Sequence, residues 1–491
     1  MRTASDEHAR MDKETYESRL PGLRSALLDV QRALSSFGAN PRPVLVILAG
    51  LDGAGRSEML NRFHEILDAR GLQVLAYDIP SDEEEARPRF WRYWRGLPAR
   101  GRIALMQGGW YGSGIEEKVT GQLSRKGLVR LMHRIVRTER ALVQDGLVLV
   151  KLFFRISEED QKDTLKRLES EPDTAWRVTA RDWKRHRKYD KYSKAWDIAL
   201  QETDLDGQEW TEISSACPRH REITAAEVVL QALQAAVSGA QQVPSDYDSA
   251  PWRVDSPRLQ ALDMEARIEK DHYAEQLADL QGDISRLTWA ARRQGRSSVL
   301  VFEGWDAAGK GGAIRRLNAA IDARLSQVIS IAAPTDEERA HHYLWRFWRH
   351  LPKAGHVTIY DRSWYGRVLV ERVEGFATES EWQRAYGEIN EFERQLSDRE
   401  VTLVKCFLHV TPEEQLRRFE ERQMTPWKQH KITSEDWRNR EKWAQYEQAI
   451  DEMVGRTNMT WSPWTLVAAN DKRQGRLAVL TAVRDALRAG E

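Results

Sequence analysis

The sequence contains very little cysteine, with only Cys217 and Cys406 in 491 residues. Two cysteines cannot build a disulfide framework or a cysteine-rich zinc site, and this scarcity fits a reducing compartment, so we expect a cytoplasmic protein. The sequence also lacks any run of about 18 apolar residues, the minimum for a membrane-spanning helix. The N-terminal segment is charged throughout and has no apolar core of the signal-peptide kind. We therefore expect no membrane partner and no export by a standard signal.

The chain has no net charge either, because it contains 75 Lys and Arg and 75 Asp and Glu. A neutral chain offers no whole-molecule attraction for nucleic acid, and we expect no nucleic acid partner, although a local basic patch can still bind an anion. With 41% hydrophobic and 31% charged residues, the composition is that of a globular protein. Its length is about twice that of a typical single-core domain, so two domains are expected.

The sequence contains its own duplicate. GLDGAGR from Gly50 matches GWDAAGK from Gly304, and FWRYWRGLP from Phe90 matches LWRFWRHLP from Leu344, both at an offset of 254 residues. A constant, ungapped register over such distances indicates two tandem copies of one domain.

Between the copies, Ser, Gly, Pro and Asp cluster in residues 238–257 and hydrophobic periodicity disappears, which is typical of a linker. We predict an N-terminal domain at 1–240, a linker at 241–257 and a C-terminal domain at 258–491. In the second copy, helical segments are predicted near 259–293 and over 312–323. Short apolar strands are predicted over 299–302, 327–332, 357–360, 401–408 and 465–468. This alternation predicts α/β domains, each with a parallel sheet covered by helices on both faces.

The segment Gly304-Trp305-Asp306-Ala307-Ala308-Gly309-Lys310-Gly311-Gly312 lies between a predicted strand and a predicted helix. In that context a G-x-x-x-x-G-K pattern is typical of a phosphate-binding loop. The glycines let backbone N–H groups surround phosphate oxygens, the helix N-terminus adds partial positive charge, and Lys310 reaches the transferring phosphoryl group. The alternative is an ordinary glycine-rich turn with a surface lysine.

Gly311 stands where such a loop normally carries a Ser or Thr that binds Mg²⁺, so another oxygen must take that role. Asp306 inside the loop is one candidate. Asp361, at the end of a predicted strand as in a Walker B element, is a second. Two carboxylates with phosphate oxygens suit Mg²⁺, with Mn²⁺ as an alternative. Asp361 could instead cap the turn that follows it.

Several arginines could add fixed positive charge near the phosphates, because a guanidinium binds phosphate bidentately and stays ionised. Arg362 follows Asp361, and Arg315 and Arg316 follow the loop. Arg346 and Arg349 either do the same or flank a tryptophan-lined packing face, and the sequence leaves both interpretations open.

From Thr411 onward the chain is dense in charge, and Pro426 interrupts it. Such a segment is usually a solvated face, but beside a phosphate site it can form a lid that closes over a polyanion and excludes water. We favour a lid whose basic residues are Arg417, Arg418, Arg422, Lys428 and Lys431. Asp471 and Lys472 follow the last predicted strand, at the ligand-binding edge of a parallel sheet.

The duplication tests these assignments within one chain. Lys310 corresponds to Arg56, Asp361 to Gln107 and Arg362 to Gly108, so the first copy lacks the candidate chemistry. The aromatic scaffold is kept, as packing positions should be: Trp91, Trp94, Trp110 and Trp183 all have tryptophan counterparts. Asp52 and the loop glycines remain, so the first copy could still accept a phosphate. We predict that it does not catalyse.

Four segments of the second copy resemble the polyphosphate kinase 2 family: GWDAAGKGG from Gly304, HLPKAGHVTIYDRSWYGR from His350, VEGF from Val373 and WTLVAANDKR from Trp464. The tandem duplication resembles the fused, AMP-phosphorylating members of that family, and the resemblance covers nearly all of both copies. It implies two thymidylate-kinase-like P-loop domains with helical lids, Mg²⁺ dependence, and phosphoryl transfer from inorganic polyphosphate to a nucleotide, with the second copy active.

The resemblance also assigns roles to residues. It gives phosphate contacts to Gly309, Lys310, Arg315 and Arg316, metal binding to Asp306 and Asp361, transition-state charge to Arg362, and lid contacts to Lys428 and Lys431. The other glycines of the loop and the two residues after the last predicted strand complete the set. The candidate phosphate- and nucleotide-binding residues are then Gly304, Gly309, Gly311, Gly312, Arg315, Arg316, Lys428, Lys431, Asp471 and Lys472.

We expect an AMP phosphate oxygen to attack the terminal phosphoryl group of polyphosphate in line, giving ADP reversibly. An ionised phosphate needs no strong general base, so catalysis reduces to positioning and charge stabilisation by Lys310, Arg362 and the metal. The alternatives are a nucleotide kinase with a nucleoside triphosphate donor and a non-catalytic polyphosphate or nucleotide sensor. Whether the duplicate builds a homo-oligomer is left open.

Overall fold

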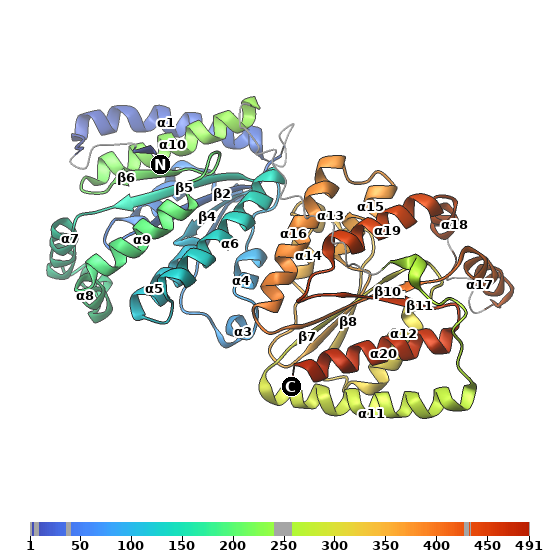
Figure 1. The fold of residues 1–491 in the computed structure, drawn as a ribbon. Coiled ribbons are helices and arrows are strands. Elements are labelled where there is room, and N and C mark those ends of the chain that lie inside the picture. The colour runs from blue at the N-terminus through green and yellow to red at the C-terminus, as the bar shows by residue number, and fades with distance from the viewer. Residues whose placement is uncertain are drawn as a thin grey trace. The chain divides into compact units, whose positions relative to one another are not determined.

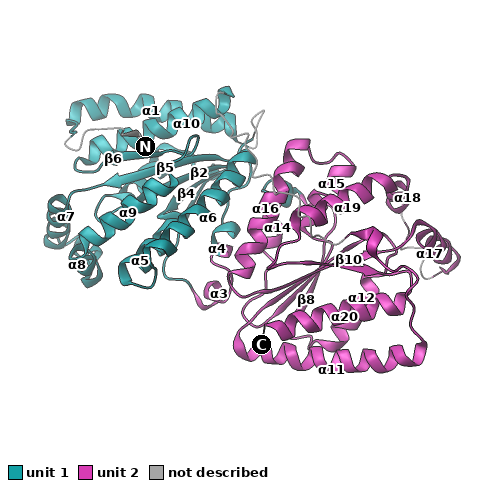
Figure 2. Ribbon diagram, in the orientation of Figure 1, with its two compact units in different colours: residues 1–80, 92–245, 336–342 teal, residues 81–91, 246–335, 343–491 magenta. Residues whose placement is uncertain are grey.

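The computed structural model describes residues 2–3, 9–35, 41–239, 258–426, 432 and 434–490, so the predicted linker at 241–257 lies outside the described residues. The chain divides into two compact units (Figure 2). Unit 1 comprises residues 1–80, 92–245 and 336–342, and unit 2 comprises residues 81–91, 246–335 and 343–491. Over the described ranges, none of the helices combines the length and the apolar character needed to cross a membrane.

Each unit is built on a parallel sheet, as predicted. In unit 1 the strand order is β1-β6-β5-β2-β4-β3, with β1 Arg2–Thr3, β2 Val44–Gly50, β3 Leu72–Ala76, β4 Ile103–Gln107, β5 Val148–Arg155 and β6 Trp210–Ser214. In unit 2 the order is β11-β10-β7-β9-β8, with β7 Ser298–Gly304, β8 Ser326–Ser330, β9 Val357–Asp361, β10 Thr402–His409 and β11 Trp464–Ala468.

Helices cover both faces of each sheet (Figure 1). In unit 2, α11 (Lys270–Gln294), α12 (Lys310–Ala320) and α20 (Lys472–Ala489) pack together, and α16 (Glu379–Ser397) packs with α19 (Trp443–Thr457). The remaining helices of unit 2 that bear on the site are α15 (Val370–Val373), α17 (Pro412–Met424) and α18 (Ser434–Glu441). The helices of unit 1 that matter below are α1 (Lys13–Leu34), α2 (Arg56–Ile66), α5 (Gly112–Thr120), α6 (Arg125–Gln144), α7 (Glu158–Ser170), α8 (Ala180–His186), α9 (Tyr189–Thr203) and α10 (Pro218–Ser238).

Both cores contain the same buried ion pair. Lys405 Nζ donates to Glu393 Oε2 at 2.9 Å, and the Trp364 indole donates to Glu393 Oε1 at 3.0 Å. In unit 1 the equivalent pair is Lys151 and Glu139, at 3.1 Å. Buried charges of this kind must be paired and hydrogen-bonded, which explains why Lys151 and Trp110 match Lys405 and Trp364 between the copies.

One predicted element is wrong in part. The helix expected near 259–293 is a short 3₁₀ turn at Leu259–Ala261, and the α-helix begins only at Lys270. Between them the Asp263 side chain accepts a hydrogen bond from the Glu265 backbone N–H at 3.0 Å. Such local side-chain bonds compete with helix formation. The other elements predicted for unit 2 lie within a few residues of the observed ones.

Candidate active site

The loop between β7 and α12 has the backbone of a phosphate-binding loop. Gly304 has φ 141°, and a Cβ there would overlap the carbonyl oxygen of Leu408 on β10, so only glycine fits. Gly309, at φ 111°, is the N-cap of α12, and Lys310 is its first residue. The Lys310 ammonium donates to the carbonyl oxygens of Gly304 and Trp305. Burial lowers the pKa of Lys310, although the nearby Asp306 carboxylate opposes this.

Asp306 lies at the centre of the side-chain contacts in the loop. Arg362 Nη2 donates to its Oδ1 at 3.1 Å, and Asn439 Nδ2, from α18, donates to its Oδ2 at 2.9 Å. Gln415, from α17, donates to its backbone carbonyl at 3.1 Å. The Asp306 carboxylate is therefore oriented by Arg362, which follows β9, and by Asn439 of α18, while α17 holds the backbone of the loop.

Asp361 is the last residue of β9, and electrostatic interactions connect it, Asp306 and Arg362 to Lys310. Its carboxylate has no hydrogen-bond or ion-pair partner in the part of the chain that the structure describes. The same described residues contain no cluster of three or more His, Cys, Asp and Glu arranged for a metal. Two carboxylates, one of them unengaged, suit a cation that takes its other ligands from phosphate and water, as Mg²⁺ does.

Glu303 is a carboxylate of the site that the motif search did not find. It is 5% exposed at the end of β7, and Ser363 Oγ donates to its Oε1 at 2.8 Å. Burial raises its pKa, while Ser363, Lys310 and Arg362 act in the opposite direction. The sequence signal was the change from Glu303 to Ala49 between the copies, together with the change from Ser363 to Gly109.

A cavity of about 80 Å³ opens on the Asp306 side of the loop. Its polar groups are Glu303, Asp306, Arg362 and Asn439, and its walls are aromatic and apolar. The residues that supply those walls are Trp305, Leu369, Val370, Phe407, Tyr446 and Ile450.

A second cavity, of about 200 Å³, opens on the other side of the loop, against Ala307, Ala308, Gly309 and Gly312. Nothing lies within 4 Å of where a Cβ would stand on Gly309. The basic side chains that line this cavity are Arg418 and Arg422 from α17 and Lys472 and Arg476 from α20. The loop is thus flanked by a basic groove and by a cavity with aromatic walls.

Arg418 has a different place from the one predicted. It is 2% exposed and donates to the carbonyl oxygens of Ala307, Ala308, Ala469 and Asn470, at 2.6 to 3.1 Å. A buried guanidinium with several acceptors is a fixed clamp. Arg418 therefore fastens the loop to the start of α20 and is not a mobile contact of a lid.

Trp305 connects the loop to α19. Its indole N–H donates to His409 Nδ1 at 2.9 Å, and its ring stacks on Trp443 with centroids 3.6 Å apart and planes 2° apart. Burial lowers the pKa of His409 to about 4, so the imidazole stays neutral and can accept this bond at neutral pH.

The other residues predicted to contact phosphate or nucleotide do not form a single cluster. Gly311 and Arg315 are exposed, and Arg316 donates to the Gly312 carbonyl at 3.1 Å. Asp471 is the N-cap of α20 and accepts from two backbone N–H groups. Arg346 donates to the Ala332 carbonyl, and Arg349 lies over the Trp345 ring. Lys428 and Lys431 lie outside the described residues.

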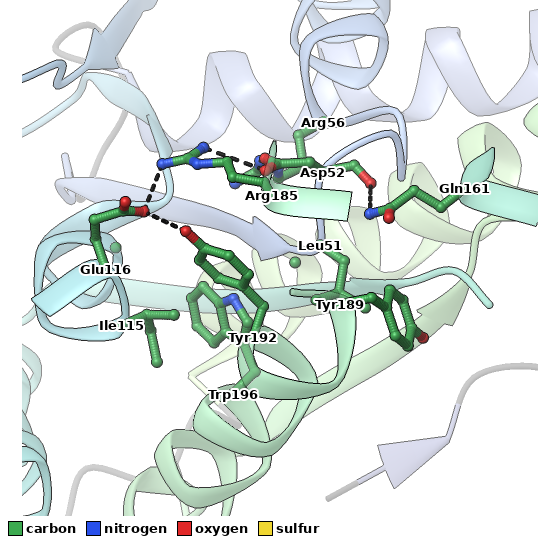
Figure 3. Close-up of a pocket in the computed structure, with 12 residues that line it drawn as sticks. Leu51, Asp52, Arg56, Ile115, Glu116, Gln161, Arg185, Tyr189, Tyr192 and Trp196 are labelled. Carbon is green, nitrogen blue, oxygen red and sulfur yellow. Dashed lines mark hydrogen bonds and ion pairs between the residues drawn. The ribbon is translucent and has the colours of Figure 1, made fainter. Parts of the chain in front are cut away.

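In unit 1 the cavity equivalent to the aromatic one is crossed by ion pairs (Figure 3). Arg56 pairs with Asp52 Oδ1 at 2.7 Å, and Arg185 pairs with Asp52 Oδ2 at 3.2 Å. Arg185 also pairs with Glu116 at 2.7 Å, and the Tyr192 hydroxyl donates to Glu116 at 2.8 Å. Both oxygens of the loop carboxylate are thus held by guanidinium groups.

The basic groove also differs in unit 1. Gly475 of unit 2 is replaced by Arg221, whose guanidinium donates to the Ala54 carbonyl and fills the space beside Gly55. Arg418 is replaced by Thr164, so Arg221 takes over part of the clamp from a different helix. The position next to the loop that is open in unit 2 is occupied by protein in unit 1.

Fold and site together define a P-loop phosphotransferase, with a glycine loop, a strand-end aspartate and basic residues around one phosphate position. The chain belongs to the polyphosphate kinase 2 family, whose model matches residues 10–241 and 267–491. It is 43% identical to the polyphosphate:AMP phosphotransferase of Pseudomonas aeruginosa, over 98% of this chain and 97% of that one. It is 36% identical to the polyphosphate:AMP phosphotransferase of Acinetobacter johnsonii, over 98% and 99%.

A solved structure agrees with these relatives. The crystal structure assigned as a polyphosphate kinase 2 from Pseudomonas aeruginosa superimposes with a TM-score of 0.86 at 41% identity, covering 98% of this chain and 97% of that one. The two tandem P-loop domains predicted from the sequence are therefore confirmed.

Proposed function

We propose that this protein transfers the terminal phosphoryl group of inorganic polyphosphate to AMP, giving ADP reversibly, and that residues 258–491 carry the reaction. The observation that carries the proposal is the pair of cavities on either side of one phosphate loop. The groove is lined by the basic residues Arg422, Lys472 and Arg476 and by one carboxylate, Glu421, and its net positive charge suits a linear polyanion. The cavity with aromatic walls beside Asp306 suits a nucleoside monophosphate.

The reaction needs the two phosphates aligned and the developing charge stabilised. The polyphosphate end would lie against the backbone N–H groups at the start of α12, with Lys310 at its terminal phosphoryl group. Arg362 projects from the end of β9 and is anchored on Asp306, so its guanidinium is already ordered before substrate binds. An ionised AMP phosphate oxygen attacks in line, and the shortened polyphosphate leaves without a proton transfer.

Asp306 and Asp361 would hold a divalent cation, for which Mg²⁺ fits best and Mn²⁺ is the alternative. When bound, such an ion neutralises phosphate charge in the transition state. The Asn439 amide keeps one Asp306 oxygen oriented, and such outer hydrogen bonds fix the direction of a ligating carboxylate.

We propose that unit 1 does not catalyse. Gln107 replaces Asp361 and Gly108 replaces Arg362, so unit 1 lacks the second carboxylate and the charge next to it. Arg221 fills the space beside Gly55 where a donor phosphate would otherwise pass. These contacts also argue against the phosphate binding that the loop glycines of the first copy left open.

The direct test follows ADP formation by the full chain with Mg²⁺, AMP and either long-chain polyphosphate or ATP as donor. ADP from polyphosphate and AMP supports the proposal. Turnover with ATP as donor and none with polyphosphate would instead make the protein a conventional nucleotide kinase, and binding without any turnover would make it a sensor.

A further inference from the structure

Helix α8 and the beginning of α9 in unit 1 carry far more positive charge than their counterparts in unit 2. Residues 181–194 contain seven Lys and Arg and two Asp. The equivalent residues 435–448 contain three Lys and Arg and four Asp and Glu. Because both copies have the same fold, the fold itself does not require the basic residues, and another cause must be sought.

Two basic side chains of this region are neutralised in unit 2, and their equivalents in unit 1 are not. Arg438 and Lys442 each form an ion pair with Glu374 at 2.9 Å. Their equivalents, Lys184 and Lys188, keep the positive charge, but the position of Glu374 is occupied by Thr120. Unit 1 has therefore lost the carboxylate while keeping both cations.

Six basic residues in this region have no ion-pair partner in the part of unit 1 that the structure describes, and all are exposed or half-buried. Arg185 is not among them, because it turns inward to Asp52 and Glu116 (Figure 3). The spacing of three residues places Arg181 and Lys184 on one side of α8, and Lys191 and Lys194 on one side of α9, while Arg187 and Lys188 lie between the two helices. These residues, which we name the α8–α9 basic face, are Arg181, Lys184, Arg187, Lys188, Lys191 and Lys194.

Six unneutralised cations within fourteen residues repel one another and raise the local concentration of anions. We propose that the α8–α9 basic face is a docking site for long-chain inorganic polyphosphate, separate from the catalytic groove and independent of metal. The proposal rests on the proposed function, since polyphosphate is there the donor substrate. A linear chain of phosphates can follow a cluster composed mainly of lysine ammonium groups, which act as point charges without fixed geometry.

The aromatic side chains of this region favour polyphosphate over nucleic acid. Single-stranded nucleic acid sites combine positive charge with aromatic rings on which bases stack. Here Trp183 meets His186 edge-on, Tyr192 donates to Glu116, and Tyr189 donates to the Ile156 carbonyl. The Arg185 guanidinium also lies over the Tyr192 ring, and within the described segment 181–194 the exposed side chains are all charged, although Trp176 just before it is 78% exposed.

Polyphosphate binding to unit 1 would give a function to the copy that we propose does not catalyse. A polyanion held anywhere on the chain is presented to the donor groove at a raised effective concentration, without any new contact in that groove. We expect the gain in effective concentration to increase with polyphosphate length, because a longer chain reaches further from the α8–α9 basic face. The face should therefore affect the KM for long chains and leave short oligophosphates unaffected.

The test compares two full-length triple variants that each remove three positive charges from unit 1. The docking variant is Lys188→Gln, Lys191→Gln and Lys194→Gln. The control is Arg10→Gln, Lys13→Gln and Arg24→Gln, at exposed positions at and just before α1. We expect the docking variant to raise the KM for long-chain polyphosphate by about tenfold. The KM for short oligophosphate, the KM for AMP and kcat should match those of the control.

A second measurement separates docking from catalysis. Binding of labelled long-chain polyphosphate is measured with a chelator present, in an Asp361→Asn background that is not expected to turn over. The docking variant should bind about tenfold more weakly and with a smaller salt dependence, since fewer phosphate contacts release fewer counterions. If no donor yields ADP in the activity assay, the proposed function fails, while this binding measurement still tests the docking site.

Two results would overturn the proposal. One is a docking variant that binds long-chain polyphosphate as tightly as the control and shows the same KM. The other is a single-stranded RNA of equal charge that displaces polyphosphate from the wild-type protein at equal or lower concentration, and does so less well from the docking variant. That second result would assign the α8–α9 basic face to nucleic acid.

Discussion

Arg362 and Gly108 occupy equivalent positions in the two copies and share one backbone conformation, with φ 64° in Arg362 and 69° in Gly108. A residue with a Cβ is strained in this left-handed region, whereas glycine is not. The two copies differ at the next residue, because Ser363 is extended at φ −151° where its equivalent Gly109 has φ 57°. Unit 2 carries the strain of an arginine there because its guanidinium reaches Asp306.

This relationship predicts opposite effects on stability and activity. Arg362→Gly should relieve the strain, about 1 kcal/mol, and so leave unit 2 at least as stable as the wild type in urea unfolding. Turnover should fall by about 100-fold or more, because the charge nearest the phosphoryl group is lost. The matched variant is Gly108→Arg, which has open space around the glycine and should lower stability slightly without changing kcat.

A second prediction concerns the strand-end carboxylate. Asp361→Asn should lower kcat by orders of magnitude, about 100-fold or more, because it removes one of the two carboxylates proposed to hold the cation. Gln107→Ala, at the equivalent position of unit 1, should change kcat little. The assay is ADP formation at saturating AMP and polyphosphate across a Mg²⁺ titration, and equal losses from the two variants would refute a single working copy.

A third prediction concerns the Arg418 clamp. Arg418→Lys keeps the charge but cannot reach four carbonyl oxygens together, so it should destabilise unit 2 by about 2 kcal/mol. The loop and the start of α20 should separate, raising the KM for polyphosphate more than the KM for AMP. Arg417→Lys is the control, because Arg417 is 59% exposed and should tolerate the change. Thermal unfolding and donor titrations measure the two effects, and unchanged values for both in Arg418→Lys would contradict the clamp.

A fourth prediction concerns pH and His409. Its folded-state pKa of about 4 lies below the unfolded value of 6.5, so the unfolded state binds the proton more readily. The stability that neutral His409 contributes is present above about pH 6.5 and is lost as the pH falls toward 4. Between pH 7 and pH 5 this loss should amount to about 2 kcal/mol in urea unfolding.

His409→Asn supplies the comparison for that experiment. The asparagine amide oxygen can still accept from the Trp305 indole but does not titrate. The variant should therefore show a smaller loss of stability than the wild type between pH 7 and pH 5. A wild-type and a variant protein with the same pH dependence would show that His409 is not the titrating group.

Much of the fold could be read from the sequence because it depends on local pattern and on repetition. Alternating short apolar runs and helical segments predicted the parallel sheets, and the constant offset of 254 residues predicted two like domains. The loop residues Gly304, Asp306 and Lys310 were found because a phosphate loop is one contiguous segment between a strand and a helix. The sequence alone also showed that the first copy has no equivalents of Asp361 and Arg362.

Contacts between distant segments could not be read in that way. The sequence showed that Arg418 is charged, and charge normally means exposure, but the tertiary structure buries it among carbonyl oxygens 51 to 111 residues away along the chain. Glu303 and Ser363 lie 60 residues apart and meet only because β7 and β9 are neighbours in the sheet. Asp306 and Asn439 meet only because α18 folds back over the loop.

The sequence by itself thus determined the repeat, the sheet class, the phosphate loop and which copy retains the candidate chemistry, because each of these depends on residue type at short spacing or on the repeat register. Only the tertiary structure decided which charged side chains line the cavities beside the loop, which hold the loop together, and which have no ion-pair partner among the described residues on α8 and α9. Whether a charge is free or neutralised depends on what the fold brings within about 4 Å of it, and residues of opposite charge reach that distance from any part of the chain.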